Sequence, residues 1–185
     1  RSMIALSKTT RPTAGRDALY IINTIQDLRQ LDVVRNDRHY ITEQLKVDPA
    51  LATLDISGRL VFVHMAQKGE RSRQLEKARC AGDRIAERLN GAKRKEAQLH
   101  SLLEDPELTL AFAEGVILGS YSFRKYMSDN KSAPTLAKLS FHAKDVTSRM
   151  IEELDDICSA VYTARDLVNE PVSFLNAAQL ASELK

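Results

Sequence analysis

Short runs of apolar residues, separated by turn-forming residues, predict a series of β-strands. The run Leu-Tyr-Ile-Ile at residues 19–22 is continuous and rich in β-forming side chains, which is typical of a buried strand. The run Leu-Val-Phe-Val at residues 60–63 is the strongest candidate for a central strand. Gly58 lies just before it and can adopt a positive φ, so we expect a hairpin there. The predicted strands are residues 19–22, 51–56, 60–65, 97–102 and 136–141.

A second pattern, with apolar residues at every third or fourth position, predicts amphipathic helices between these strands. Capping residues indicate several helix ends. Asp105-Pro106 supplies an N-cap and a first helical residue, Asn90-Gly91 is expected to end the preceding helix, and Asn176 could cap a last one. The predicted helices cover residues 37–46, 70–89, 145–169 and 176–184, together with one that opens at residue 105.

Strands that alternate with helices predict an α/β fold, in which helices cover both faces of a sheet. The chain of 185 residues is long enough for one core of ordinary size and a terminal appendage. The apolar run at residues 108–123 contains Glu114 and is shorter than a membrane span of about 20 residues, so it predicts a buried helix. Gly115 and Gly119 in that run are expected where the helix approaches the sheet closely. No association with a membrane is expected.

The charge of the chain is small overall but unevenly distributed. A formal net charge of +2, with 28% charged residues, does not require a nucleic-acid or acidic-membrane partner. Residues 70–96 hold nine Lys/Arg and five Asp/Glu, whereas residues 145–185 hold three Lys/Arg and eight Asp/Glu. We interpret the two stretches as solvated helix faces that complement each other within the domain or across an oligomer. The alternative is a basic binding face at residues 70–96.

The two cysteines, Cys80 and Cys158, each lie in a helical pattern beside apolar residues, where a free cysteine behaves as a small hydrophobic side chain. They form no Cys-x-x-Cys pair. The sequence shows no secretory signal, so a reducing, cytoplasmic location is expected.

Two stretches in the second half of the chain resemble one enzyme family. Residues 164–171, Ala-Arg-Asp-Leu-Val-Asn-Glu-Pro, resemble the junction before the catalytic domain of a leucyl (cytosol) aminopeptidase. Residues 113–126 carry the pattern Glu-Gly-x-x-Leu-x-x-Tyr-x-Phe-x-x-Tyr, which is similar to a helix near the end of that family's N-terminal domain. Residues 1–59 match weakly. Glu170 stands where the family more often has Thr, so we expect the contacts of the junction to differ there.

The resemblance implies a three-layer, macro-domain-like α/β fold with a mixed sheet. It divides the chain into an N-terminal α/β domain (1–143), a connector helix (144–170) and the start of a truncated catalytic domain (171–185). The full-length parent would be a homo-hexamer that removes N-terminal residues from peptides with two divalent metal ions, zinc or manganese. This chain would be non-catalytic, would pack on its own catalytic domain, and would contain no catalytic, metal-binding or cofactor-binding residue.

The ligands that a two-metal peptidase needs are missing from the sequence. The family's Asn-Thr-Asp-Ala-Glu-Gly-Arg motif and its lysine-containing Gly-Lys-Gly segment are both absent. Glu152 and Asp156 share a helix face at the i, i+4 spacing, but Glu153 and Asp155 point elsewhere, so we interpret this acidic cluster as a solvated face. The histidines show no zinc-binding spacing and are interpreted as surface or core-edge residues. They are His39, His64, His100 and His142.

Motifs for other catalytic or binding sites are absent or weak. The sequence contains no Gly-x-Ser-x-Gly elbow and no glycine-rich loop that cradles phosphate. The best nucleic-acid signal is Lys93-Arg94-Lys95 together with the basic side chains of the preceding helix. Acidic residues interrupt this field, and no aromatic residue lies within it for base stacking. A stand-alone module that binds nucleic acid or protein through residues 70–96 is therefore the alternative hypothesis. The upstream basic residues are Arg71, Arg73, Lys77, Arg84 and Arg88.

Overall fold

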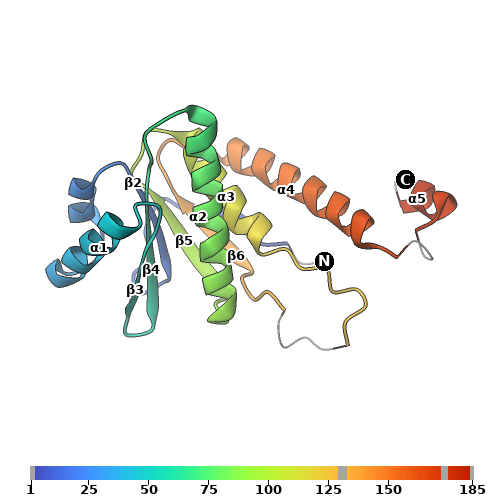
Figure 1. Cartoon of the computed structure of the whole chain (residues 1–185), viewed down its shortest axis with the longest axis horizontal. Coiled ribbons are helices and arrows are strands. Elements are labelled where there is room, and N and C mark those ends of the chain that lie inside the picture. The colour runs from blue at the N-terminus through green and yellow to red at the C-terminus, as the bar shows by residue number, and fades with distance from the viewer. Residues whose placement is uncertain (1–2, 129–132, 172–174, 184–185) are drawn as a thin grey trace.

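The computed structural model describes residues 3–128, 133–171 and 175–183. Figure 1 shows a sheet with helices on both faces and one long helix that extends away from it. The strands are β1 (Ala5–Lys8), β2 (Ala18–Ile22), β3 (Ala52–Ile56), β4 (Arg59–Met65), β5 (Glu96–Ser101) and β6 (Lys138–His142). The helices are the 3-10 helix η1 (Ile25–Gln30), α1 (Arg35–Val47), α2 (Arg71–Gly91), α3 (Pro106–Gly119), α4 (Ser148–Asn169) and α5 (Ala177–Glu183).

The six strands form one mixed sheet in the order β1-β6-β5-β2-β4-β3. Every neighbouring pair is parallel except β3 and β4, which form an antiparallel hairpin at one edge. The hairpin turn is as predicted, because Ser57 and Gly58 both have positive φ angles, of 52° and 88°. β4 has a neighbour on each side, but β2 and β5 occupy the middle of the sheet. The predicted α/β fold with a mixed sheet flanked by helices is confirmed.

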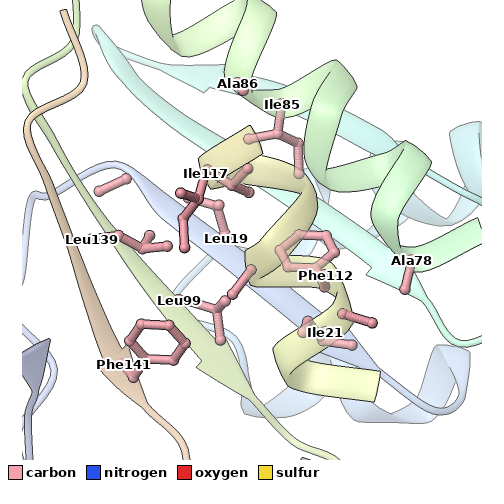
Figure 2. Close-up of a cluster of buried hydrophobic side chains, with 14 of the residues drawn as sticks. Leu19, Ile21, Ala78, Ile85, Ala86, Leu99, Phe112, Ile117, Leu139 and Phe141 are labelled. Atoms are coloured by element: carbon pink, nitrogen blue, oxygen red, sulfur yellow. The ribbon is translucent and has the colours of Figure 1, made fainter. Parts of the chain in front are cut away.

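Each face of the sheet has its own core. Leu19 and Ile21 of β2 point toward α2, α3 and α4, whereas Tyr20 and Ile22 point toward α1 and η1. Figure 2 shows Phe112 and Ile117 of α3 among side chains of the sheet and of α2. The helix α3 is apolar on most of its surface because it lies between these two layers.

The glycines of α3 lie at a close contact, but with α2 rather than with the sheet as we expected. A Cβ atom at Gly115 would lie within 3.0 Å of the backbone of Arg79. One at Gly119 would meet Asp83, and one at Gly82 of α2 would meet the backbone of Phe112. The two helices therefore touch backbone to backbone, which only glycine permits at these positions.

Several predicted helix ends are wrong by a few residues. α4 begins at Ser148 rather than at residue 145, because the Thr147 hydroxyl caps it by accepting a hydrogen bond from the Met150 amide. α2 continues through Gly91 rather than ending before Asn90-Gly91, and Lys93, just after the helix, has a positive φ of 56°. Asn176 caps α5 as predicted, whereas Leu184 lies outside the described residues.

The first strand, β1, has no counterpart among the sequence predictions. Its residues are at most half-buried and form no apolar run, because it is a four-residue edge strand. In the part of the chain that the structure describes, no helix has the length and apolar character needed to cross a membrane.

Candidate functional site

The two family-like stretches lie far apart in the sequence but pack against each other in the structure. The first includes the end of α3 and the irregular segment 120–126, and the second includes the last turns of α4. The chain turns sharply after Gly119, where the Ser120 hydroxyl donates to the Val116 carbonyl and accepts from the Asn90 side chain. This turn directs segment 120–126 toward α4.

Tyr121 is at the centre of the contact. Its hydroxyl donates to Asp166 Oδ1 at 2.7 Å and accepts from Asn169 Nδ2 at 3.2 Å. The guanidinium of Arg165 lies 5.3 Å from the Tyr121 ring centroid, and the same side chain donates to the Leu118 carbonyl at 3.0 Å. Three residues of the junction motif therefore bind Leu118, near the end of α3, or Tyr121, two residues after the helix.

Glu170 makes a second set of contacts with the same segment. One oxygen accepts from Lys125 Nζ at 2.6 Å and the other from the Tyr126 hydroxyl at 2.5 Å. The Glu170 side chain is only 9% exposed, whereas that of Lys125 is 42% exposed. The hydrogen bond to Glu170 also raises the pKa of Tyr126. A shorter side chain such as threonine could not reach both partners, so Glu170 has a local structural role.

These residues together are called the junction clamp: Tyr121, Lys125, Tyr126, Asp166, Asn169 and Glu170. Tyr162, one turn of α4 before Asp166, extends the contact inward. Its ring lies edge-on to that of Tyr121 at 5.0 Å, and its hydroxyl donates to the Ile117 carbonyl at 2.5 Å. Burial raises the pKa of Tyr162 to about 12, so the hydroxyl remains a donor at neutral pH.

A cleft of about 640 Å³ opens beside the junction clamp. Both family-like stretches line it through Tyr121, Lys125, Asp166 and Glu170, and the apolar side chains Ile4, Leu136 and Leu175 complete its wall. The lining thus combines charged groups that pair with each other and apolar surface. It offers packing area rather than an arrangement of acid, base and nucleophile.

The acidic cluster of α4 does not fit a metal site. Glu152 and Asp156 are exposed, and Glu153 pairs with Arg149 one turn away at 3.0 Å. Across the described ranges, no three His, Cys, Asp or Glu side chains converge in a way that could hold a metal ion. The side chains here therefore do not suit a pair of divalent ions.

Two of the histidines meet on the sheet, which the sequence did not predict. His100 of β5 and His142 of β6 are register partners with ring centroids 5.5 Å apart, and Tyr20 stacks on His100 at 4.8 Å. Burial, and then the proximity of His142, lowers the pKa of His100 to about 4. Only a known strand order could have revealed this pair. His39 is exposed on α1, and His64 is fully buried in β4.

Three basic side chains of α2 have acidic partners elsewhere in the chain. Arg71 binds Asp105 at 2.7 Å and Glu107 at 2.5 Å. Arg79 pairs with Glu114 at 2.8 Å, and Arg84 pairs with Asp48 at 2.8 Å. The expectation that the basic and acidic stretches complement each other is wrong for these three arginines, because their partners lie in α3 and its N-cap and at the end of α1.

The two cysteines differ in environment. Cys158 is buried in α4 as predicted, and burial raises the pKa of its thiol to about 12. Cys80 is exposed on α2, contrary to the prediction, and its thiol donates to Glu76 at 3.6 Å. Neither thiol is activated as a nucleophile.

Comparison with known proteins identifies relatives of this chain. No family profile matches it. The probable cytosol aminopeptidase of Mycobacterium bovis (strain BCG / Pasteur 1173P2) is 39% identical over 125 residues, which are 64% of this chain and 23% of that protein. This chain therefore spans less than a quarter of the length of that relative.

Solved structures share the fold at lower identity. A mutant of tomato leucine aminopeptidase superimposes with a TM-score of 0.69 and 19% identity, covering 97% of this chain and 41% of that one. The bottromycin maturation enzyme BotP, in complex with Mn, gives 0.64 and 20%, covering 92% and 35%. This chain is similar in sequence and in fold to the N-terminal region of the leucyl (cytosol) aminopeptidases.

Proposed function

We propose that this chain is the non-catalytic N-terminal domain of a leucyl-aminopeptidase-like metallopeptidase. In this proposal, residues 1–143 form the α/β domain, residues 144–170 are the connector to the catalytic domain, and residues 171–185 begin that domain. The full-length parent would remove N-terminal residues from peptides in the cytoplasm. The observation that carries the proposal is the packing of the two family-like stretches against each other at the junction clamp.

The form of α4 supports a role in packing. The N-terminal part of α4 buries Ile151, Leu154 and Cys158 against the domain, whereas its later turns extend away from the sheet (Figure 1). Two apolar side chains of this helix are exposed to solvent, Ile157 by 57% and Val168 by 85%. These two side chains are available for contact with a further domain or subunit. Contacts with the chain's own catalytic domain, and with other subunits of a homo-hexamer, would cover them and shape access to the site.

The reaction centre would lie in the parent's catalytic domain. Two divalent ions, zinc or manganese, would supply the Lewis acid and the activated water there. The Mn bound to BotP supports divalent metal chemistry among proteins of this fold. The described residues of this chain, which do not fit a metal pair, would position that domain rather than hold its ions.

Activity measurements test the proposal directly. Residues 1–185 should not hydrolyse a leucine anilide, with or without added zinc or manganese, whereas a chain extended through the downstream domain should do so. A mock purification controls for contaminating peptidases. Turnover together with tight, stoichiometric metal binding by residues 1–185 would contradict the proposal, and so would an extended chain without any peptidase activity.

A further inference from the structure

The turn between α1 and β3, residues 48–51, is held in place by side chains from other parts of the chain. His64 Nδ1 lies 2.6 Å from the Ala50 carbonyl oxygen, and the Gln67 amide donates to the Pro49 carbonyl at 3.0 Å. Arg84 of α2 donates to the Asp48 carboxylate at 2.8 Å. The position of this turn therefore depends on these contacts, and so does the start of the edge strand β3.

His64 has an unusual environment for a titratable group. It is 0% exposed, and its ring stacks on Phe112 of α3 with centroids 5.5 Å apart. A carbonyl oxygen can only accept a hydrogen bond, so Nδ1 carries the proton of the neutral ring and Nε2 is left as an acceptor. Nε2 is buried and meets no hydrogen-bond partner among the residues that the structure describes. Within the described part of the chain, only Nδ1 of the ring therefore makes a hydrogen bond.

Protonation would place a charge and an unpaired N–H at Nε2 inside the core. Asp48 is the acidic group that acts on the ring, but its carboxylate already pairs with Arg84. The acidic residues of α3, Glu107 and Glu114, pair with arginines of α2. Burial outweighs the attraction of Asp48 and of the Ala50 carbonyl and lowers the pKa of His64.

We propose that His64 is an acid-sensitive latch: the protonated ring is better accommodated in water than in the core, so proton uptake is coupled to release of the 48–51 turn and detachment of β3 from β4. Opening this edge of the sheet would expose the charged ring to water and would break the pairing of only two strands, β3 and β4. β3 has only one neighbouring strand, and Pro49 is already exposed. The rest of the sheet would keep its pairing, because β4 stays paired with β2 and β5 lies between β2 and β6.

Amide hydrogen exchange, measured residue by residue by NMR, tests the latch. After correction for intrinsic exchange, the opening of β3 should increase by up to about tenfold per pH unit below about pH 6.5, because one proton is taken up on opening. His64→Gln retains a donor for the Ala50 carbonyl but cannot titrate, so the increase should disappear. The matched control is His39→Gln, which changes an exposed histidine of α1 and should leave the acid response intact.

The location of the response separates the latch from general acid unfolding. His100 also resists protonation, but it lies in β5, so its effect should appear in the amides of β5 and β6. An acid response of β3 that persists in His64→Gln would overturn the proposal. If that variant does not fold, the unmodified chain decides: equal opening of β3 at pH 7 and pH 5 overturns the latch, and an increase confined to β3 and the β4 amides that pair with it supports it.

Discussion

Tyr121 and Asp166 are 45 residues apart in the sequence, and a 2.7 Å hydrogen bond joins their side chains. The bond connects the segment after α3 to the last turns of α4. The direction of α4 therefore depends on Tyr121, a side chain that lies outside the helix.

Replacing Tyr121 with Phe should destabilise the chain by about 1 kcal/mol, because the Asp166 carboxylate and the Asn169 amide each lose a partner. Urea unfolding followed by circular dichroism measures the change. Tyr40→Phe removes the hydroxyl of a tyrosine that is 54% exposed on α1 and provides the control. Equal stability of the two variants would show that the Tyr121 hydroxyl contributes nothing to the clamp.

Glu170→Gln should weaken the clamp by removing the charge that Lys125 and Tyr126 bind. Because the hydrogen bond to Glu170 is the main cause of the raised pKa of Tyr126, that pKa should move back toward its ordinary value. Ultraviolet titration of the tyrosines, with Tyr126→Phe used to assign the signal, measures the shift. Glu152→Gln removes an exposed charge of the same helix and should leave the titration unchanged.

Gly115→Ala should destabilise the chain by about 1–3 kcal/mol, since the added methyl group would overlap the backbone of Arg79 and force α2 and α3 apart. Gly91→Ala is the matched control. Nothing lies within 4 Å of a Cβ atom at Gly91, which is the last residue of α2. That variant should be neutral or slightly stabilising. Thermal midpoints that are unchanged for both variants would contradict the packing described here.

Stability should decrease as the pH falls from about 6.5 toward 4. The pKa of His100 is lowered to about 4 in the folded chain, so the unfolded chain binds the proton first and gains stability through this window. Above pH 6.5 both states are neutral and the contribution is fully present. His100→Gln should flatten the decrease measured by urea unfolding at several pH values, whereas His39→Gln should not. A profile that His100→Gln leaves unaltered would exclude this residue as a cause.

Binding of duplex DNA should be weak and should disappear near physiological salt. Arg71, Arg79 and Arg84 already pair with carboxylates of the domain, so few charges remain to displace counterions from phosphate. Fluorescence anisotropy with a labelled duplex at increasing salt provides the measurement. Submicromolar binding that resists salt would favour the alternative function, a binding module built on residues 70–96.

The parts of the fold that depend on local pattern could be predicted from the sequence. The continuous apolar run of β2 and the apolar stripe of α2 correspond to their elements because burial determines both pattern and structure. β1 could not be predicted, since a short edge strand has no buried pattern of its own. Helix ends are harder to predict, because more than one residue near each end can act as a cap. Thr147, and not the nearby Asp145, is the N-cap of α4, and the positive φ after α2 falls on Lys93 rather than on Gly91.

The candidate site was recognisable only in pieces. Each family-like stretch could be identified by its own residues, but the contact of Lys125 with Glu170 depends on the path of α4. The pairing of His100 with His142 depends likewise on the order of strands in the sheet. Contacts across such distances follow from tertiary packing, which a single sequence does not encode in any local pattern.

The position of β1 has a consequence for the order in which the chain can fold. Ala5 pairs with Lys138, so the first strand cannot join the sheet until almost the whole domain has emerged from the ribosome. The β3–β4 hairpin, by contrast, closes over a two-residue turn and can form early. Until β6 is in place, β1 has no partner and β5 is an open edge, the kind of exposed strand that recruits other chains. The time between synthesis of residue 101 and of residue 142 is therefore the period in which a nascent chain is most exposed to misassembly.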